Sequence, residues 1–74
     1  MDIREIFAFN LKAFRRAKRL SQEELAHLAG IDRTYVSLLE RRVYSASIDV
    51  VQQLATALNV EADELLKRPV KARK

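Results

Sequence analysis

Residues 33–41 combine hydrogen-bonding side chains with a helical spacing that gathers them on one face. At ~100° per residue, Thr34, Ser37 and Leu38 point away from the apolar side of such a helix, with Arg33 at the edge. A guanidinium can form a bidentate pair with guanine, a hydroxyl can bond to a base, and apolar groups can contact the thymine methyl. These side chains therefore predict reading of base edges in the major groove, where the N-terminal residues of a helix reach deepest. The alternative is a helix start that simply faces solvent.

The composition limits the chain to one small domain and a few kinds of chemistry. Its 74 residues include no cysteine and one histidine, which excludes disulfides and ordinary zinc sites. No apolar run approaches the ~20 residues that a membrane span needs, and the N-terminus lacks a signal-peptide pattern, so we expect a cytoplasmic protein without a membrane partner. Fourteen Lys and Arg against ten Asp and Glu give a net charge of +4. That excess mildly indicates a nucleic-acid partner, although the basic clusters could equally be solvated faces.

Apolar residues recur at three- and four-residue steps in five segments, and no segment alternates as a strand would. We therefore predict five helices and no strand. The first helix runs from about Ile3 to Lys18, and the fifth from about Ala62 to Lys67. The expected core residues of the first helix are Ile3, Phe7, Leu11, Phe14 and Ala17, and those of the fourth are Ile48, Val51, Leu54, Ala55 and Leu58.

The second and third helices are marked by their ends. In "LSQEEL", Ser21 and Glu24 have the spacing of a capping box. Gly30, the only glycine in the chain, ends the second helix, and Asp32 can cap the third. Ala26 supplies a small side chain where the two helices would cross. Two helices joined by a tight turn at glycine form the helix-turn-helix unit.

The stretch "LSQEELAHLAGIDRTYVSLLERR" resembles the helix-turn-helix of Cro/repressor-type regulators, also called XRE-like, and the resemblance covers about residues 7–66. Matches at the family's spacing are Gln22, Ala26, Gly30, Val36 and Leu39. The segment "DRTYVS" is also similar to restriction–modification controller proteins. The resemblance implies an all-α, compact five-helix lambda-repressor-like domain with a helix-turn-helix that binds double-stranded DNA. Residues 1–68 would form this domain, and residues 69–74 a basic, disordered tail.

The resemblance also implies roles for individual residues. Base reading would fall to Arg33, Thr34, Ser37 and Leu38. Phosphate contacts would fall to Ser21, Gln22, Arg41, Tyr44 and Ser45, with the hydroxyl of Tyr35 as a further candidate. Arg15 and Glu40 match a buried ion pair that ties the first helix to the third. The chain departs from the family at Arg19 and Arg42, which stand where many members have glycine, and this leaves both turns open.

A single recognition helix offers few contacts, so we expect a homodimer that reads an inverted-repeat operator, with two copies of the third helix ~34 Å apart. The predicted dimer surface comprises Val60, Ala62, Leu65 and Leu66, although these residues could serve only the core. RNA polymerase is a further candidate partner, and we expect no cofactor, metal or small-molecule ligand.

Other functions remain open at this level. A DNA-binding antitoxin or a protein-interaction module could use the same fold. An enzyme is disfavoured because no nucleophile stands beside the histidine and no glycine-rich loop could cradle a phosphate.

Overall fold

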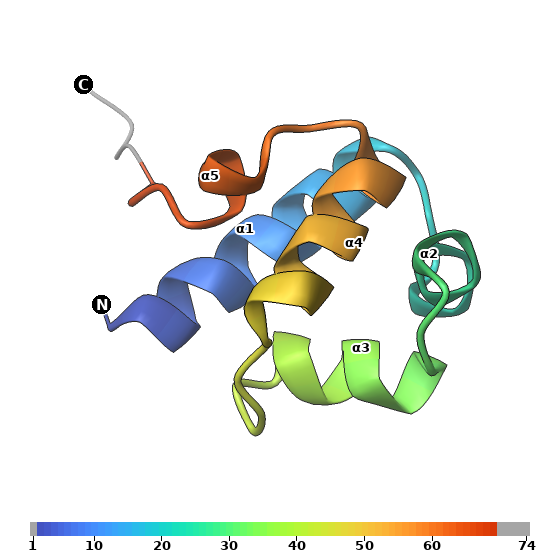
Figure 1. Ribbon diagram of the computed structural model, residues 1–74, viewed down its shortest axis with the longest axis horizontal. Helices are drawn as coiled ribbons and strands as arrows, with labels where there is room; N and C mark the ends of the chain where they lie inside the picture. The colour runs from blue at the N-terminus through green and yellow to red at the C-terminus, as the bar shows by residue number, and fades with distance from the viewer. Residues whose placement is uncertain (1, 70–74) are drawn as a thin grey trace.

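Five helices organise residues 2–69, the part of the chain that the computed structural model describes: α1 (Ile3–Ala17), α2 (Gln22–Ala29), α3 (Arg33–Glu40), α4 (Ile48–Leu58) and α5 (Ala62–Leu65). Figure 1 shows α2 and α3 together on one side of the molecule, while α5 packs against α1 and α4 on the other. These residues contain no strand, so the predicted all-α, five-helix fold is confirmed. Of the predicted tail, residues 70–74 lie outside the described part. No helix within residues 2–69 has the length and apolar character that crossing a bilayer requires.

Side-chain caps determine where several helices begin. Ser21 Oγ accepts the N–H of Glu24 at 2.9 Å, and Glu24 Oε1 accepts the N–H of Ser21 at 2.7 Å, which is the predicted capping box. Asp2 and Glu5 form a second capping box at α1, with distances of 3.0 and 2.9 Å, which was not predicted from the sequence. The backbone hydrogen bond from Glu5 holds the pKa of the Asp2 carboxyl below its ordinary value. These bonds satisfy amides that a helix start otherwise leaves unpaired.

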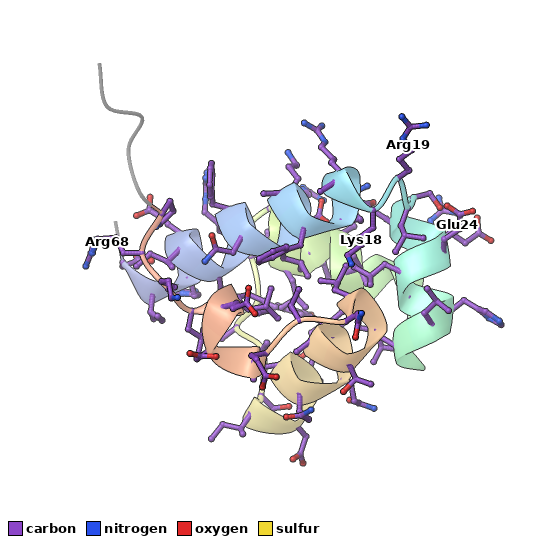
Figure 2. The ribbon with its side chains drawn as sticks, turned by 90° about the horizontal axis from the view of Figure 1, so that it is seen from above. Lys18, Arg19, Glu24 and Arg68 are labelled. Atoms are coloured by element: carbon purple, nitrogen blue, oxygen red, sulfur yellow. The ribbon has the colours of Figure 1, made fainter. Side chains whose placement is uncertain are left out.

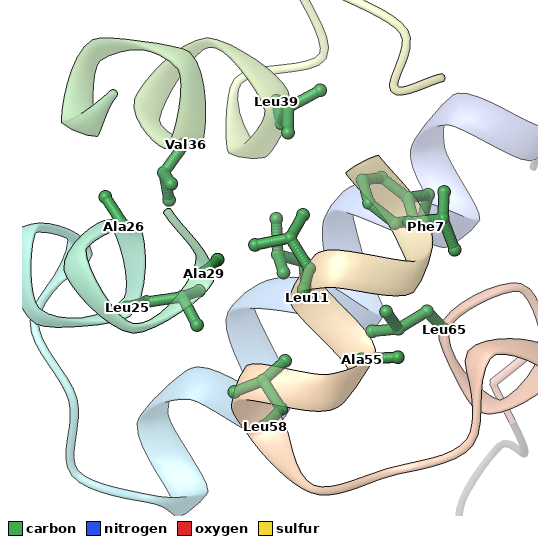
Figure 3. Close-up of a cluster of buried hydrophobic side chains, with 12 residues drawn as sticks. Phe7, Leu11, Leu25, Ala26, Ala29, Val36, Leu39, Ala55, Leu58 and Leu65 are labelled. Atoms are coloured by element: carbon green, nitrogen blue, oxygen red, sulfur yellow. The ribbon is translucent and has the colours of Figure 1, made fainter. Parts of the chain in front are cut away.

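The core is built mainly from leucine and small residues contributed by all five helices. The largest fully buried side chains are Leu11, Leu25, Leu39, Leu54, Leu58, Leu65 and Val36. Figure 3 shows Val36 pointing from α3 toward α2, which presents Ala26 and Ala29 on that side. Because alanine side chains are short, α3 can approach α2 closely and still exclude water.

One polar side chain ties the last helix to the first. Asn10, on α1, is buried, and its Nδ2 donates to the carbonyl of Leu65 at 3.0 Å and to that of Lys67 at 2.7 Å. The carbonyls at the end of α5 have no partners within that helix, so the amide of Asn10 satisfies groups that burial would otherwise leave unpaired. This contact and the buried Leu65 hold α5 against α1.

The predicted core pattern is wrong at its edges. Ile3 and Ile48, both predicted to be buried, are 57% and 88% exposed. Each is the first residue of its helix, and the buried residues begin about one turn later, at Ile6 and Phe7 in α1 and at Val51 in α4. Ala17 is also exposed, at the last position of α1. Helix α5 ends at Leu65, two residues before the predicted end at Lys67.

Two arginines occupy the left-handed region of backbone space. Arg19 has φ 61° and Arg42 has φ 65°, close to the φ of 74° at Gly30. At both positions, many members of the family that the sequence resembles have glycine, and the turns keep the geometry that glycine would adopt without strain. For a residue with a Cβ this conformation costs ~1–2 kcal/mol. Figure 2 shows the Arg19 side chain projecting outward from the turn between α1 and α2.

Candidate nucleic-acid interface

The turn at Gly30 sets the angle between α2 and α3. Gly30 adopts φ 74° and ψ 30°, and the next N–H, of Ile31, donates to the carbonyl of Ala26 at 3.0 Å. Asp32 then caps α3, because its Oδ1 accepts the N–H of Thr34 at 2.7 Å. The chain thus leaves one helix and enters the next within three residues, and α3 runs along the edge of the molecule in Figure 1.

Helix α3 divides into a core face and an outward face. Val36, Leu39 and Glu40 are buried, whereas the candidate base readers Arg33 and Thr34 are exposed. The other two candidates, Ser37 and Leu38, are half-buried. The outward face therefore begins at the first turn of α3 and becomes less accessible toward its C-terminal end. A protruding first turn is the part of such a helix that can reach deepest into a major groove.

The candidate phosphate contacts fall on both sides of α3. Ser21 and Gln22 begin α2, whereas Arg41, Tyr44 and Ser45 follow α3 and are exposed. The ring of Tyr35, which is half-buried, meets that of Tyr44 edge to face, with centroids 6.1 Å apart and planes at 65°. This aromatic pair holds part of the loop after α3 against the helix itself.

Three helices meet at the carboxylate of Glu40. Arg15 on α1 donates to it from Nε at 2.7 Å and from Nη2 at 3.0 Å, and its Nη1 donates to the carbonyl of Leu20 at 2.8 Å. Gln22, at the start of α2, donates from Nε2 to Glu40 at 3.0 Å. The hydrogen bond with Glu40 raises the pKa of Arg15 above its ordinary value. The cluster therefore links the end of α1 and the start of α2 to the end of α3.

Gln22 has a partner that its position in the sequence did not indicate. Its residue number is 18 away from that of Glu40, and the contact requires α2 and α3 to be already packed. An amide nitrogen carries two hydrogens, so one remains to donate outward after the bond to Glu40 is made. The contact therefore orients Gln22 and is compatible with a phosphate ligand.

A polar hollow of about 400 Å³ lies beside these groups and is lined by Arg15, Ser21, Gln22, Glu23 and Arg33. At its rim, Nη1 of Arg33 stands 3.6 Å from Oε1 of Glu23. Within residues 2–69, no three His, Cys, Asp or Glu side chains are grouped so that they could hold a metal ion.

The four predicted dimer residues are not equivalent in the structure. Leu65 is fully buried in the monomer's own core, so its assignment to a dimer surface is wrong. Val60 and Ala62 are half-buried and pack against the core, whereas Leu66 is 42% exposed. Leu66 borders a small hollow of about 90 Å³ that Ile3 also lines, so the exposed apolar surface here extends onto α1.

Comparison with known proteins identifies the type of domain. A family model described as Helix-turn-helix matches residues 11–65. The chain belongs to the helix-turn-helix family. This helix-turn-helix protein is 44% identical, over 68 residues, to the "Neisseria hypothetical transcription factor" of Neisseria meningitidis, a match that covers 92% of the chain and 64% of that relative. It is also 41% identical to "Control protein C.SmaI" of Serratia marcescens, over 92% of the chain and 81% of the relative.

A solved structure supports the same assignment. The restriction-modification controller protein C.AhdI from Aeromonas hydrophila matches the helix-turn-helix protein with a TM-score of 0.81 and 45% identity, over 84% of this chain and 94% of that one. The family and the relatives are DNA-binding transcription regulators and not enzymes. The resemblance of the sequence to XRE-like regulators is accordingly confirmed.

Proposed function

We propose that this regulator binds an inverted-repeat DNA operator as a homodimer and controls a restriction–modification system. The observation that carries the proposal is the exposed first turn of α3, where the side chains of Arg33 and Thr34 are open to solvent. Those two side chains offer a guanidinium and a hydroxyl to base edges, and the capped start of α3 keeps the turn helical. Ser37 and Leu38 would add contacts with less accessible atoms.

The surroundings of α3 supply the backbone contacts of the proposed complex. Ser21 and Gln22 would bind phosphate on one side, and Arg41, Tyr44, Ser45 and the hydroxyl of Tyr35 would do so on the other. Such contacts orient a helix in the groove but carry no sequence information of their own. Because they release counterions, the affinity should fall steeply as the salt concentration rises.

The proposed dimer would use the exposed apolar side chains at the end of the molecule that holds α5. Leu66 contributes to this surface, with Ile3 beside it across the small hollow. Ile48 adds to it on α4, one turn before Val51, which lines that hollow. Figure 1 places α5 and the start of α1 away from α2, so a contact there leaves the helix-turn-helix free to meet DNA.

The controller role is supported by the names of two relatives. One is named control protein C.SmaI, and the other is named restriction-modification controller protein C.AhdI. RNA polymerase is part of the proposal as a second protein partner of the DNA-bound dimer. A DNA-binding antitoxin is the rival within the same class. An interaction module that no longer binds DNA is the rival outside it, and the exposed polar first turn of α3 argues against that rival.

Selection of bound sites from random duplex DNA tests the proposal. We expect a two-fold symmetric site with guanine where Arg33 reaches. Arg33→Ala should relax the preference at that position, whereas Gln22→Ala should weaken binding to all sequences to a similar degree. If the wild-type protein enriches no sequence, or enriches a site without two-fold symmetry, the proposed homodimeric operator complex is wrong.

A further inference from the structure

The carboxylate of Glu23 lies beside Arg33, the first of the proposed base-reading side chains on α3. Glu23, in the first turn of α2, approaches Arg33 with Oε1 at 3.6 Å from Nη1, and the two side chains are 75% and 67% exposed. Both belong to the polar hollow that includes Gln22, so the carboxylate faces the space where proposed base and phosphate contacts meet. A negative charge there repels the DNA backbone, and its presence requires an explanation.

We propose that Glu23 is a specificity-determining residue, which makes Arg33 favour a neutral base edge over a backbone phosphate. This inference rests on the proposed function, because it assigns Glu23 a role in the same DNA complex. The pair of Glu23 and Arg33 carries no net charge, so it contributes little to the attraction that any DNA sequence exerts on cations.

The geometry of a guanidinium allows Arg33 to contact a guanine and Glu23 at the same time. Arginine has five N–H donors in a planar fork. Two of them can bind the N7 and O6 atoms of guanine while the guanidinium keeps its ion-pair contact with Glu23. The guanine acceptors are uncharged, so Glu23 does not oppose them. A phosphate bound at the same place would bring a second anion next to Glu23, and the pair of Glu23 and Arg33 would have to separate.

Neighbouring groups leave Glu23 free for this role. Glu24, the next carboxylate, accepts the N–H of Ser21 at 2.7 Å and so caps α2. Glu40 is buried among Arg15 and Gln22. Glu23 can therefore lose its charge without removing the cap or the buried cluster, which makes it suitable for a test in the intact protein.

The test compares four proteins: wild type, Glu23→Gln, Arg33→Ala and the double variant. Binding to a random-sequence DNA duplex is measured by fluorescence anisotropy over a series of salt concentrations. Glu23→Gln should bind this duplex up to about 5-fold more tightly at low salt, the range expected for an exposed ion pair. The slope of log K against log salt should steepen by up to about 0.9, because Arg33 gains a phosphate contact. Sites selected from random DNA should show a weaker guanine preference.

Two controls separate this effect from a change in net charge. Asp63→Asn removes one exposed negative charge on α5, away from α3 (Figure 1), and should steepen the slope less than Glu23→Gln does. In the double variant the steepening should disappear, since Arg33 is absent. Equal slopes for Glu23→Gln and Asp63→Asn, or a steepening that survives in the double variant, would overturn the inference while the proposed function stands. A wild-type protein that selects no sequence would overturn both.

Discussion

Glu40 of α3 receives two hydrogen bonds from Arg15 of α1, from Nε at 2.7 Å and Nη2 at 3.0 Å, and the Glu40 side chain is 1% exposed. The ion pair is therefore nearly enclosed, and Gln22 adds a third bond to the same carboxylate. Removal of one partner from such a pair leaves the other charge largely buried and without its counter-charge.

Glu40→Ala should lower the free energy of unfolding by about 3–5 kcal/mol, because Arg15 loses its carboxylate partner. Urea denaturation followed by circular dichroism measures the loss. The matched control is the double variant Arg15→Leu/Glu40→Leu, which buries no charge and should lose much less. Equal losses in the two proteins would show that the charge of Arg15 is well solvated without Glu40.

Arg19→Gly and Arg42→Gly should each stabilise the protein. Relief of left-handed strain is worth about 1–2 kcal/mol, and the greater freedom of glycine in the unfolded chain offsets about 0.4–1 kcal/mol of that gain. The control is Lys18→Gly, next to Arg19 but with φ −88°, which should destabilise the protein. The midpoints of urea denaturation show whether each variant is more or less stable than the wild-type protein. If Arg19→Gly and Lys18→Gly shifted the midpoint in the same direction, the strain assigned to Arg19 would be absent.

Gly30→Ala tests the turn of the helix-turn-helix directly. A Cβ added at Gly30 would meet no atom within 4 Å, so the substitution changes the backbone preference without a steric clash. We expect a loss of about 1–2 kcal/mol from the left-handed conformation alone, seen in the same denaturation experiment. Gly30→Asn is the control, since asparagine tolerates this region better. If Gly30→Asn lost as much stability as Gly30→Ala, the loss would have a cause other than the left-handed backbone conformation.

Leu66→Ser and Ile48→Ser should weaken self-association of the proposed dimer, because each removes an exposed apolar side chain from its surface. Sedimentation velocity over a range of protein concentrations measures the change. Leu28→Ser is the matched control, since Leu28 is similarly exposed but lies on α2. Should Leu28→Ser dissociate the protein and the other two leave it intact, the dimer surface would lie on the helix-turn-helix side.

The start of α1 should respond to acid. The folded-state pKa of Asp2 lies below its ordinary value of 3.8, mainly because the Glu5 N–H donates to it. The stabilisation is therefore present above that ordinary value and is lost as the pH falls through the lowered folded-state pKa. The amide shift of Glu5, followed by NMR, should titrate with a midpoint below 3.8. In Asp2→Asn that transition should vanish, and a midpoint above 3.8 in wild type would contradict the cap.

Local signals predicted much of the fold. The capping box at Ser21 and the left-handed turn at Gly30 involve residues a few positions apart, so their spacing in the sequence was sufficient. The exposure of Ile48 was not predictable from its apolar character, because the edge of the core depends on how far neighbouring helices extend. The contact of Asn10 with the carbonyl of Leu65 joins residues 55 positions apart, and no local pattern indicates it.

The candidate site also has features that were predictable from the sequence and features that were not. Helical geometry predicted which residues of α3 lie away from the core, because each residue of a helix is rotated by about 100° from the one before it. The approach of Glu23 to Arg33 depends on the angle at which α2 and α3 cross, as does the bond from Gln22 to Glu40. Both contacts arise from tertiary packing, and residue types alone did not indicate them.

The attachment of α5 through Asn10 has a consequence for how the protein would respond to its own abundance. A helix of four residues has no stability by itself, so α5 stays wound only while α1 and the core hold it. If two subunits meet beside Leu66, the partner adds contacts to those that Asn10 and the core already make with α5, and mass action then favours the folded pair. The fraction of paired subunits would then rise with the protein concentration, and occupancy of the proposed operator would rise more steeply than it would for a protein that binds as a single subunit.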